Sequence, residues 1–99
     1  MNTYHIFFGK LANELKIKIL ASLKQKEKSV QELAKELRIE QSKLSHALAS
    51  LKVCNIVKVR QSGKKRIYSV NKETILPILK LIDKHERKFC KHCCVRSKK

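Results

Sequence analysis

Residues 29–53 hold the feature that most limits the fold, which is a pair of short amphipathic helices separated by about three residues. Ser29 to Glu32, "SVQE", matches a capping box that starts a helix. One apolar stripe follows, made of Val30, Leu33, Ala34 and Leu37. Residues 41–53, "QSKLSHALASLKV", repeat the helical pattern with Leu44, Leu48 and Leu51 facing inward. Two short helices with so short a link predict a helix-turn-helix.

A β-hairpin is predicted directly after this helix pair. Residues 56–60, "IVKVR", and 66–70, "RIYSV", alternate between apolar and polar and are rich in β-branched side chains. The segment between them, "QSGKK", contains a glycine suited to a tight turn. A hairpin that follows a helix-turn-helix and has basic residues at its tip is typical of a wing.

Two further helices are predicted outside this unit. Residues 11–24, "LANELKIKILASLK", have helical apolar spacing, and Ile6 to Phe8 form an apolar patch on the same or an adjoining helix. Residues 25–28 are expected to be a polar turn. The last helix is predicted over residues 74–94, with Thr74 as its cap and Pro77 in its first turn.

The last helix carries an apolar stripe in addition to the apolar residues that already form a core for the helix-turn-helix and hairpin. The stripe consists of Ile75, Ile78, Leu79, Ile82 and Phe89. It predicts a homodimer contact through the first and last helices, and the alternative is packing on the first helix of the same chain. The predicted fold class is mainly α with a small β-hairpin (α+β). We expect one winged helix-turn-helix domain over residues 1–99, marginal as a monomer, with helix 74–94 for dimerisation and a Cys/His-rich tail.

The charge of the chain indicates a polyanionic partner. There are 24 Lys and Arg residues against 8 Asp and Glu, giving a net charge of +16. Residues 1–50 have 9 basic and 5 acidic side chains, and residues 51–99 have 15 and 3, so the balance rises from +4 to +12. Such a field favours nucleic acid. Solvated lysines without a partner are the alternative, and a membrane surface is disfavoured because the basic residues are not confined to one amphipathic helix.

Several function classes are not indicated. No secretory signal or membrane-spanning run is visible, so we expect a cytoplasmic protein. We find no paired-carboxylate site, glycine-rich phosphate loop or Ser-His-Asp set, and therefore predict a protein that is not an enzyme, with no small-molecule substrate identified.

The ordered series of segments resembles the ArsR family of winged-helix repressors, from about Phe8 to Leu81. "LANELKIKIL" looks like the first-helix motif of that family, "SVQELAKEL" like its scaffold helix, and residues 41–70 like its recognition helix, turn and wing. The resemblance implies a sequence-specific transcriptional regulator of double-stranded DNA, expected to be a repressor. The histidine of the family's Ser-x-His-Leu is shifted by one position here, in Ser45-His46-Ala47-Leu48. Asn55 replaces the family's glycine after the recognition helix and can take the same left-handed conformation.

The DNA contacts follow from this arrangement. The recognition helix would enter the major groove with its N-terminal end, and the wing would meet the backbone or minor groove. The candidate residues are Gln41, Ser42, Lys43, Ser45 and His46 on the helix, and Arg60, Lys64, Lys65 and Arg66 on the wing. Lys24, Lys26 and Lys28 are further candidates for phosphate contacts, and Cys54 is expected to be a small buried filler. An architectural chromatin-type protein and an RNA-associated winged helix are the alternative functions.

The Cys/His-rich end could hold a metal ion. The resembled family has a zinc site on its last helix, and Asp83-Lys-His85 reproduces the first half of that site, whereas the second half is missing at the expected distance. Cys90, Cys93 and Cys94 have i, i+3, i+4 spacing, which would let thiolates converge on a helix. The candidate Zn²⁺ ligands are His85, Cys90, His92, Cys93 and Cys94. A disulfide and free thiols are the alternatives, and a redox Cys-x-x-Cys is disfavoured because a helix C-terminus opposes the thiolate.

Overall fold

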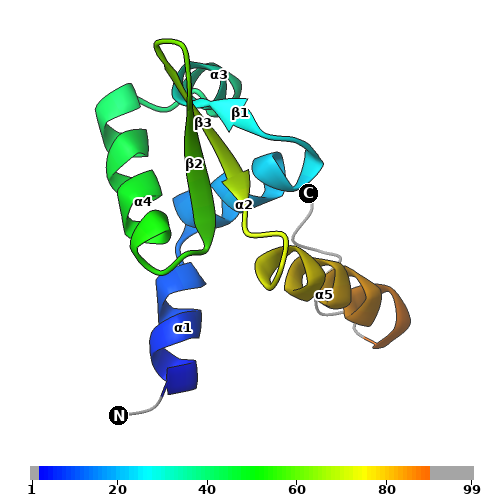
Figure 1. Cartoon of the computed structure of the whole chain (residues 1–99). Helices are drawn as coiled ribbons and strands as arrows, with labels where there is room; N and C mark the ends of the chain where they lie inside the picture. Colours follow the sequence, from blue (N-terminus) through cyan, green and yellow to red (C-terminus); the bar gives the residue numbers. More distant parts are fainter. Residues whose placement is uncertain (1–2, 90–99) are drawn as a thin grey trace.

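A computed structural model of the chain describes residues 3–89 (Figure 1). Its elements are α1 (Thr3–Leu11), α2 (Glu14–Gln25), β1 (Lys28–Ser29), α3 (Val30–Leu37), α4 (Gln41–Val53), β2 (Val57–Ser62), β3 (Lys65–Val70) and α5 (Ile75–Phe89). Helices α2, α3 and α4 gather around a small sheet, and α1 and α5 extend away from this body (Figure 1). This arrangement confirms the predicted winged helix-turn-helix. None of the helices in residues 3–89 is long and apolar enough to span a membrane.

The helix-turn-helix forms as its capping signals predict. The Ser29 side chain accepts a hydrogen bond from the Glu32 amide at 3.1 Å, and the Ser29 amide donates to the Glu32 carboxylate at 2.8 Å. That backbone hydrogen bond lowers the pKa of Glu32 below its usual value. Helix α3 ends where Arg38 takes a left-handed conformation with φ 58°, a place that glycine usually fills. Arg38 and the two residues after it form the link to α4, whose bounds are those predicted.

The sheet has three antiparallel strands in the order β1-β3-β2. Strand β1 was not predicted, because a two-residue strand shows no alternation; its Lys28 pairs with Tyr68 in β3. The hairpin pairs continuously from Val57 with Val70 to Ser62 with Lys65. Its turn is therefore only two residues long, shorter than predicted, and Gly63 supplies the positive φ of 63° that such a turn requires.

One hydrophobic core joins the helices to the sheet. The predicted inward leucines Leu33, Leu44, Leu48 and Leu51 are fully buried, whereas Leu37 is only partly buried against the same core, which also includes side chains of α2, β2 and β3. The fully or nearly fully buried members include Ile19, Leu20, Leu23, Leu33, Leu44, Leu48, Leu51, Val57, Tyr68 and Val70. This packing fixes which face of α4 remains open to solvent.

The predicted single helix over residues 11–24 is wrong at its start, because the chain breaks there into two helices. The Asn13 side chain accepts a hydrogen bond from the Lys16 amide at 3.0 Å, which makes Asn13 the N-cap of α2. Leu11 therefore ends α1 instead of beginning the next helix. The apolar patch at Phe7 and Phe8 lies on this adjoining helix, one of the two placements expected.

Thr74 directly precedes α5, as predicted for its cap, and its carbonyl accepts from the Ile78 amide at 3.2 Å, while Asn71 organises the loop before it. The Asn71 side-chain oxygen accepts from the amides of Glu73 and Thr74, and its side-chain nitrogen donates to the Asn55 carbonyl at 2.9 Å. Asn71 thereby joins the loop after α4 to the loop before α5. Residues 90–94 of the predicted last helix lie outside the described part of the chain.

The prediction that Cys54 is buried is wrong, because its side chain is exposed. Helix α4 ends at Val53, and Asn55 turns the chain with φ 58°, the left-handed conformation expected of it. This turn directs Ile56 into the core, where only 1% of it is exposed, and its amide donates to the Leu51 carbonyl. Ile56 takes the inward place that was expected for the cysteine.

Candidate nucleic-acid interface

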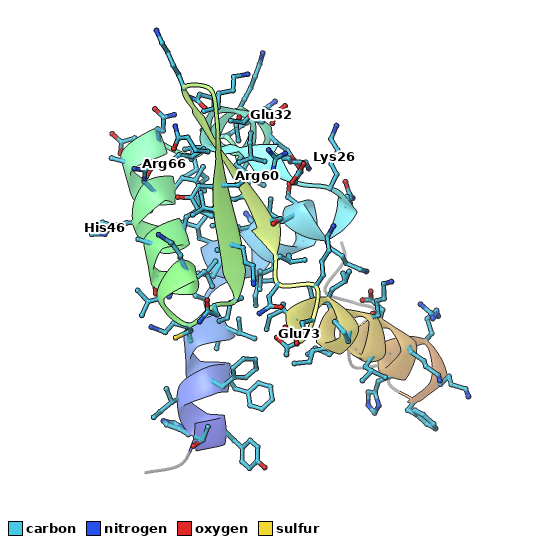
Figure 2. All side chains as sticks on the ribbon, viewed as in Figure 1. Lys26, Glu32, His46, Arg60, Arg66 and Glu73 are labelled. Carbon is cyan, nitrogen blue, oxygen red and sulfur yellow. The ribbon has the colours of Figure 1, made fainter. Side chains whose placement is uncertain are left out.

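The exposed face of α4 carries the five side chains predicted for the recognition helix. Gln41, Ser42, Lys43, Ser45 and His46 are all exposed. The opposite face of the helix is held in the core by leucines, so these side chains cannot turn inward. Figure 2 shows His46 pointing away from the body of the molecule. The arrangement presents a row of hydrogen-bonding groups on a rigid element.

A polar cleft of about 410 Å³ lies between α4, the start of α3 and the wing. Its lining residues are Val30, Gln31, Gln41, Ser42, Ser45, Gln61, Lys64 and Arg66. The structure therefore brings three predicted helix residues together with two predicted wing residues. Gln31 and Gln61 were not predicted from the sequence. Only the strand register could have found Gln61, because it sits opposite Arg66 in the hairpin.

The same register divides the basic residues of the wing between two faces. Residues that pair across strands point to the same face, and successive residues alternate. Gln61 and Arg66 form one such pair and both line the cleft. Arg60 pairs with Ile67, and Lys65 pairs with Ser62, so these two basic residues lie on the opposite face. The four predicted wing residues are therefore not equivalent.

Arg60 already has an anionic partner. Its guanidinium donates to both carboxylate oxygens of Glu27, at 2.6 Å from Nη2 and 3.4 Å from Nε. The hydrogen bond from Arg60 lowers the pKa of Glu27, and the same pair raises the pKa of Arg60. A DNA phosphate would have to compete with this carboxylate for the guanidinium.

Two of the three lysines expected to give additional phosphate contacts are also held by carboxylates. Lys28 is buried, with its ammonium 2.7 Å from the Ser22 hydroxyl and 2.8 Å from Glu36. The hydrogen bonds from Lys28 and Ser22 lower the pKa of Glu36. Lys24 forms an ion pair with Asp83 of α5. The expectation is therefore wrong for Lys28, and Lys24 is engaged in joining α2 to α5.

An apolar groove of about 870 Å³ lies between α1, α2 and α5. Phe8, Leu11, Ile17, Leu20, Ile78, Leu79 and Ile82 are among its lining residues. Ile75, predicted as a dimer contact, is instead buried in the core of its own chain, at the start of α5 a few residues after the end of β3. Ile78 and Leu79 pack partly against that core, whereas Ile82 is 53% exposed and Phe89 74%. The stripe thus begins inside the subunit and ends on its surface.

Of the metal candidates, His85 is the one within the described residues. It is exposed on α5, with its ring centre 5.4 Å from that of Phe89. Within residues 3–89, no three His, Cys, Asp or Glu side chains lie close enough together to hold a metal ion. Cys90, His92, Cys93 and Cys94 lie outside the described residues.

Comparisons with known proteins agree with this geometry. The family model described as "Bacterial regulatory protein, arsR family" matches residues 13–59, from the cap of α2 into β2. The crystal structure of Mycobacterium tuberculosis Rv0081 is 33% identical, with 82% of each chain covered and a TM-score of 0.77. The chain belongs to the ArsR family.

Other ArsR-type similarities extend over most of the chain. The nodulation protein NolR of Rhizobium meliloti is 34% identical over 73 residues. The chain spans 60–65% of the length of the curated relatives it matches. A solution structure from Mycobacterium bovis, Mb0332, is 25% identical with a TM-score of 0.77 and covers 85% of this chain and 78% of its own. It is described as a homodimeric winged helix-turn-helix DNA-binding domain of a possible ArsR-family regulator.

Proposed function

We propose that this ArsR-family chain is a sequence-specific regulator of transcription that binds double-stranded DNA and acts as a repressor. The observation that carries the proposal is the row of polar side chains on α4 beside the polar cleft, to which the wing contributes Lys64 and Arg66. With α4 in the major groove, Gln41 can pair with adenine and Lys43 with guanine or phosphate. Ser42, Ser45 and His46 supply further donors and acceptors for base edges.

Backbone contacts are assigned to the wing. Lys64 and Arg66 share the cleft with the α4 residues, so a DNA strand held against α4 lies within their reach. Lys65 stands at the tip beside them, on the other face, and is assigned a weaker contact. Arg60 is assigned to its ion pair with Glu27, with at most a minor share in DNA binding. These charges position the duplex, whereas the α4 residues read its sequence.

A second copy of the chain is the proposed occupant of the apolar groove. Ile17, Ile82 and Phe8 are large apolar side chains that are each about half exposed along it. Such a patch favours association. The homodimeric description of Mb0332 supports the same kind of partner here. A two-fold dimer would present two α4 helices to successive turns of the duplex.

The function is tested by selecting the duplexes that the protein binds from a random pool. The affinity of the protein for a selected duplex is then compared with its affinity for unrelated duplexes and for RNA of equal length. We expect preference for the selected duplex. Replacing Ser42, Lys43 and His46 by alanine should reduce that preference by about tenfold or more, because each good base contact contributes roughly 1–3 kcal/mol of discrimination. Equal binding to all duplexes would favour an architectural protein, and preference for RNA would favour the RNA-associated alternative.

We also propose that the Cys/His-rich end binds Zn²⁺ and makes the regulator metal-responsive. Thiolates and imidazoles are suitable ligands for tetrahedral zinc. His85 is exposed and close in sequence to Cys90, His92, Cys93 and Cys94, whereas the Asp83 carboxylate is engaged by Lys24. The proposed site therefore depends on sulfur and nitrogen ligands.

Elemental analysis of the reduced protein should find about one Zn²⁺ per subunit, and a Cys90→Ser, Cys93→Ser double variant should lose it. Binding should weaken as the pH falls, because protons compete for the thiolates. A sensory site should also change DNA affinity by roughly 5- to 150-fold on metal addition. Equally low zinc in both proteins would reject the site, and a mass lower by two hydrogens per bridge in unreduced protein would indicate a disulfide.

A further inference from the structure

Two lysines from different helices converge on one hydroxyl of the recognition helix. The ammonium of Lys16 in α2 donates to Ser50 Oγ at 2.9 Å, and that of Lys10 in α1 donates to the same oxygen at 3.5 Å. Both lysines and Ser50 are half-buried. The break at Asn13 produces this arrangement, because it lets α1 and α2 approach α4 separately.

This pair of positive charges lacks a carboxylate partner within residues 3–89. The ion pairs there join Lys18 to Glu14, Lys24 to Asp83, Lys28 to Glu36 and Arg60 to Glu27. A hydroxyl can accept their hydrogen bonds but cannot neutralise two ammonium groups. Like charges held together repel, so the free protein retains an unfavourable interaction that a bound anion would relieve.

The site of Lys10, Lys16 and Ser50 lies at the C-terminal end of α4, whereas the polar cleft lies at its N-terminal end. The cleft is lined by residues of the first turns of α4, Gln41, Ser42 and Ser45, whereas Ser50 belongs to the last turns. Figure 1 shows α1 leaving the body beside the C-terminal end of α4, while the wing tip stands near its N-terminal end. Basic groups are thus placed at both ends of the recognition helix.

The dimensions of α4 suit a contact at each edge of the major groove. A helix of 13 residues is about 20 Å long, whereas the groove is about 12 Å wide. With the N-terminal half of α4 at the base edges, its C-terminal turns extend toward a sugar–phosphate strand. A phosphate there can accept several charge-assisted hydrogen bonds at once.

We propose that Lys10, Lys16 and Ser50 form a phosphate clamp, which binds a DNA backbone phosphate at the edge of the major groove away from the polar cleft. The clamp rests on the proposed function, since it needs α4 in the groove. It adds a contact from α1 and α2, outside the helix-turn-helix and wing. It contributes affinity and register without reading sequence.

The test compares two double variants of the full chain that each remove two positive charges. Lys10→Ala, Lys16→Ala removes the clamp, and Lys18→Ala, Lys80→Ala removes two exposed lysines elsewhere. Binding to the selected duplex is measured between 50 and 200 mM salt, a range of about fourfold over which phosphate binding has a large effect. The clamp variant should lower the slope of log affinity against log salt by about 0.9 for each phosphate that it no longer neutralises, and the control should leave the slope unchanged.

A second measurement locates the phosphate. Ethylation of single phosphates should reveal one position that wild type requires and the clamp variant does not. Equal slopes and equal ethylation patterns in the two double variants overturn the clamp. The clamp is also overturned if its variant has a lower melting temperature but an unchanged slope of log affinity against log salt, since the lysines would then only hold α1 and α2 on α4. If wild type does not prefer duplex DNA, the proposed function itself is wrong.

Discussion

Replacing Lys64 and Arg66 together by alanine is expected to weaken binding to every duplex about 10- to 100-fold at physiological salt. Both side chains line the cleft beside α4, where a DNA strand would run. Each phosphate that is no longer neutralised lowers the salt-dependence slope by about 0.9, and in a dimer the substitution acts at both half-sites. The relative preference among sequences should persist, because backbone contacts carry no direct sequence information.

Arg60→Ala is the matched control for this experiment. It also removes a positive charge from the wing, but from the opposite face of the hairpin and from an ion pair with Glu27. Its effect on affinity should be several-fold smaller. Binding isotherms at several salt concentrations give the duplex affinity of both variants and its salt dependence. If Arg60→Ala weakens binding as much as the cleft variant, the assignment of the two wing faces is wrong.

Replacing Ile82 by lysine is expected to convert a homodimer into a monomer. Ile82 lines the apolar groove and is 53% exposed in the single subunit. A lysine there would place a charge without a partner in the contact, once from each subunit. A buried charge without a partner costs about 3 kcal/mol or more, which corresponds to at least a hundredfold weaker dimer. DNA affinity should fall with it, because a monomer holds one half-site.

Leu81→Lys provides the control on the same helix. Leu81 is 63% exposed and is not among the groove residues, so the added charge remains in water. Sedimentation at micromolar concentration should show this variant as a dimer like wild type and Ile82→Lys as a monomer. A monomeric wild type rejects the proposed dimer, and dissociation of both variants alike places the contact on a different face of α5.

Local patterns were enough to predict the central part of the fold. The capping box, the leucine spacing and the β-branched alternation each act within a few residues, so α3, α4 and the hairpin followed from the sequence. The exposed face of α4 followed as well, because burying Leu44, Leu48 and Leu51 leaves the other face open. The same reasoning failed at Asn13, where an N-cap hydrogen bond overrides continuous helical spacing.

The partners of the charged side chains were decided only by the tertiary structure. The sequence determined a basic helix-turn-helix with a wing, whereas the hairpin register decided that Arg66 faces the cleft and Arg60 faces Glu27. Packing of α2 against α3 buried Lys28 beside Glu36, and the meeting of α1, α2 and α4 gathered Lys10 and Lys16 at Ser50. Periodicity describes one element at a time, but an ion pair or a clamp depends on atoms that are distant in sequence and meet only when the elements pack.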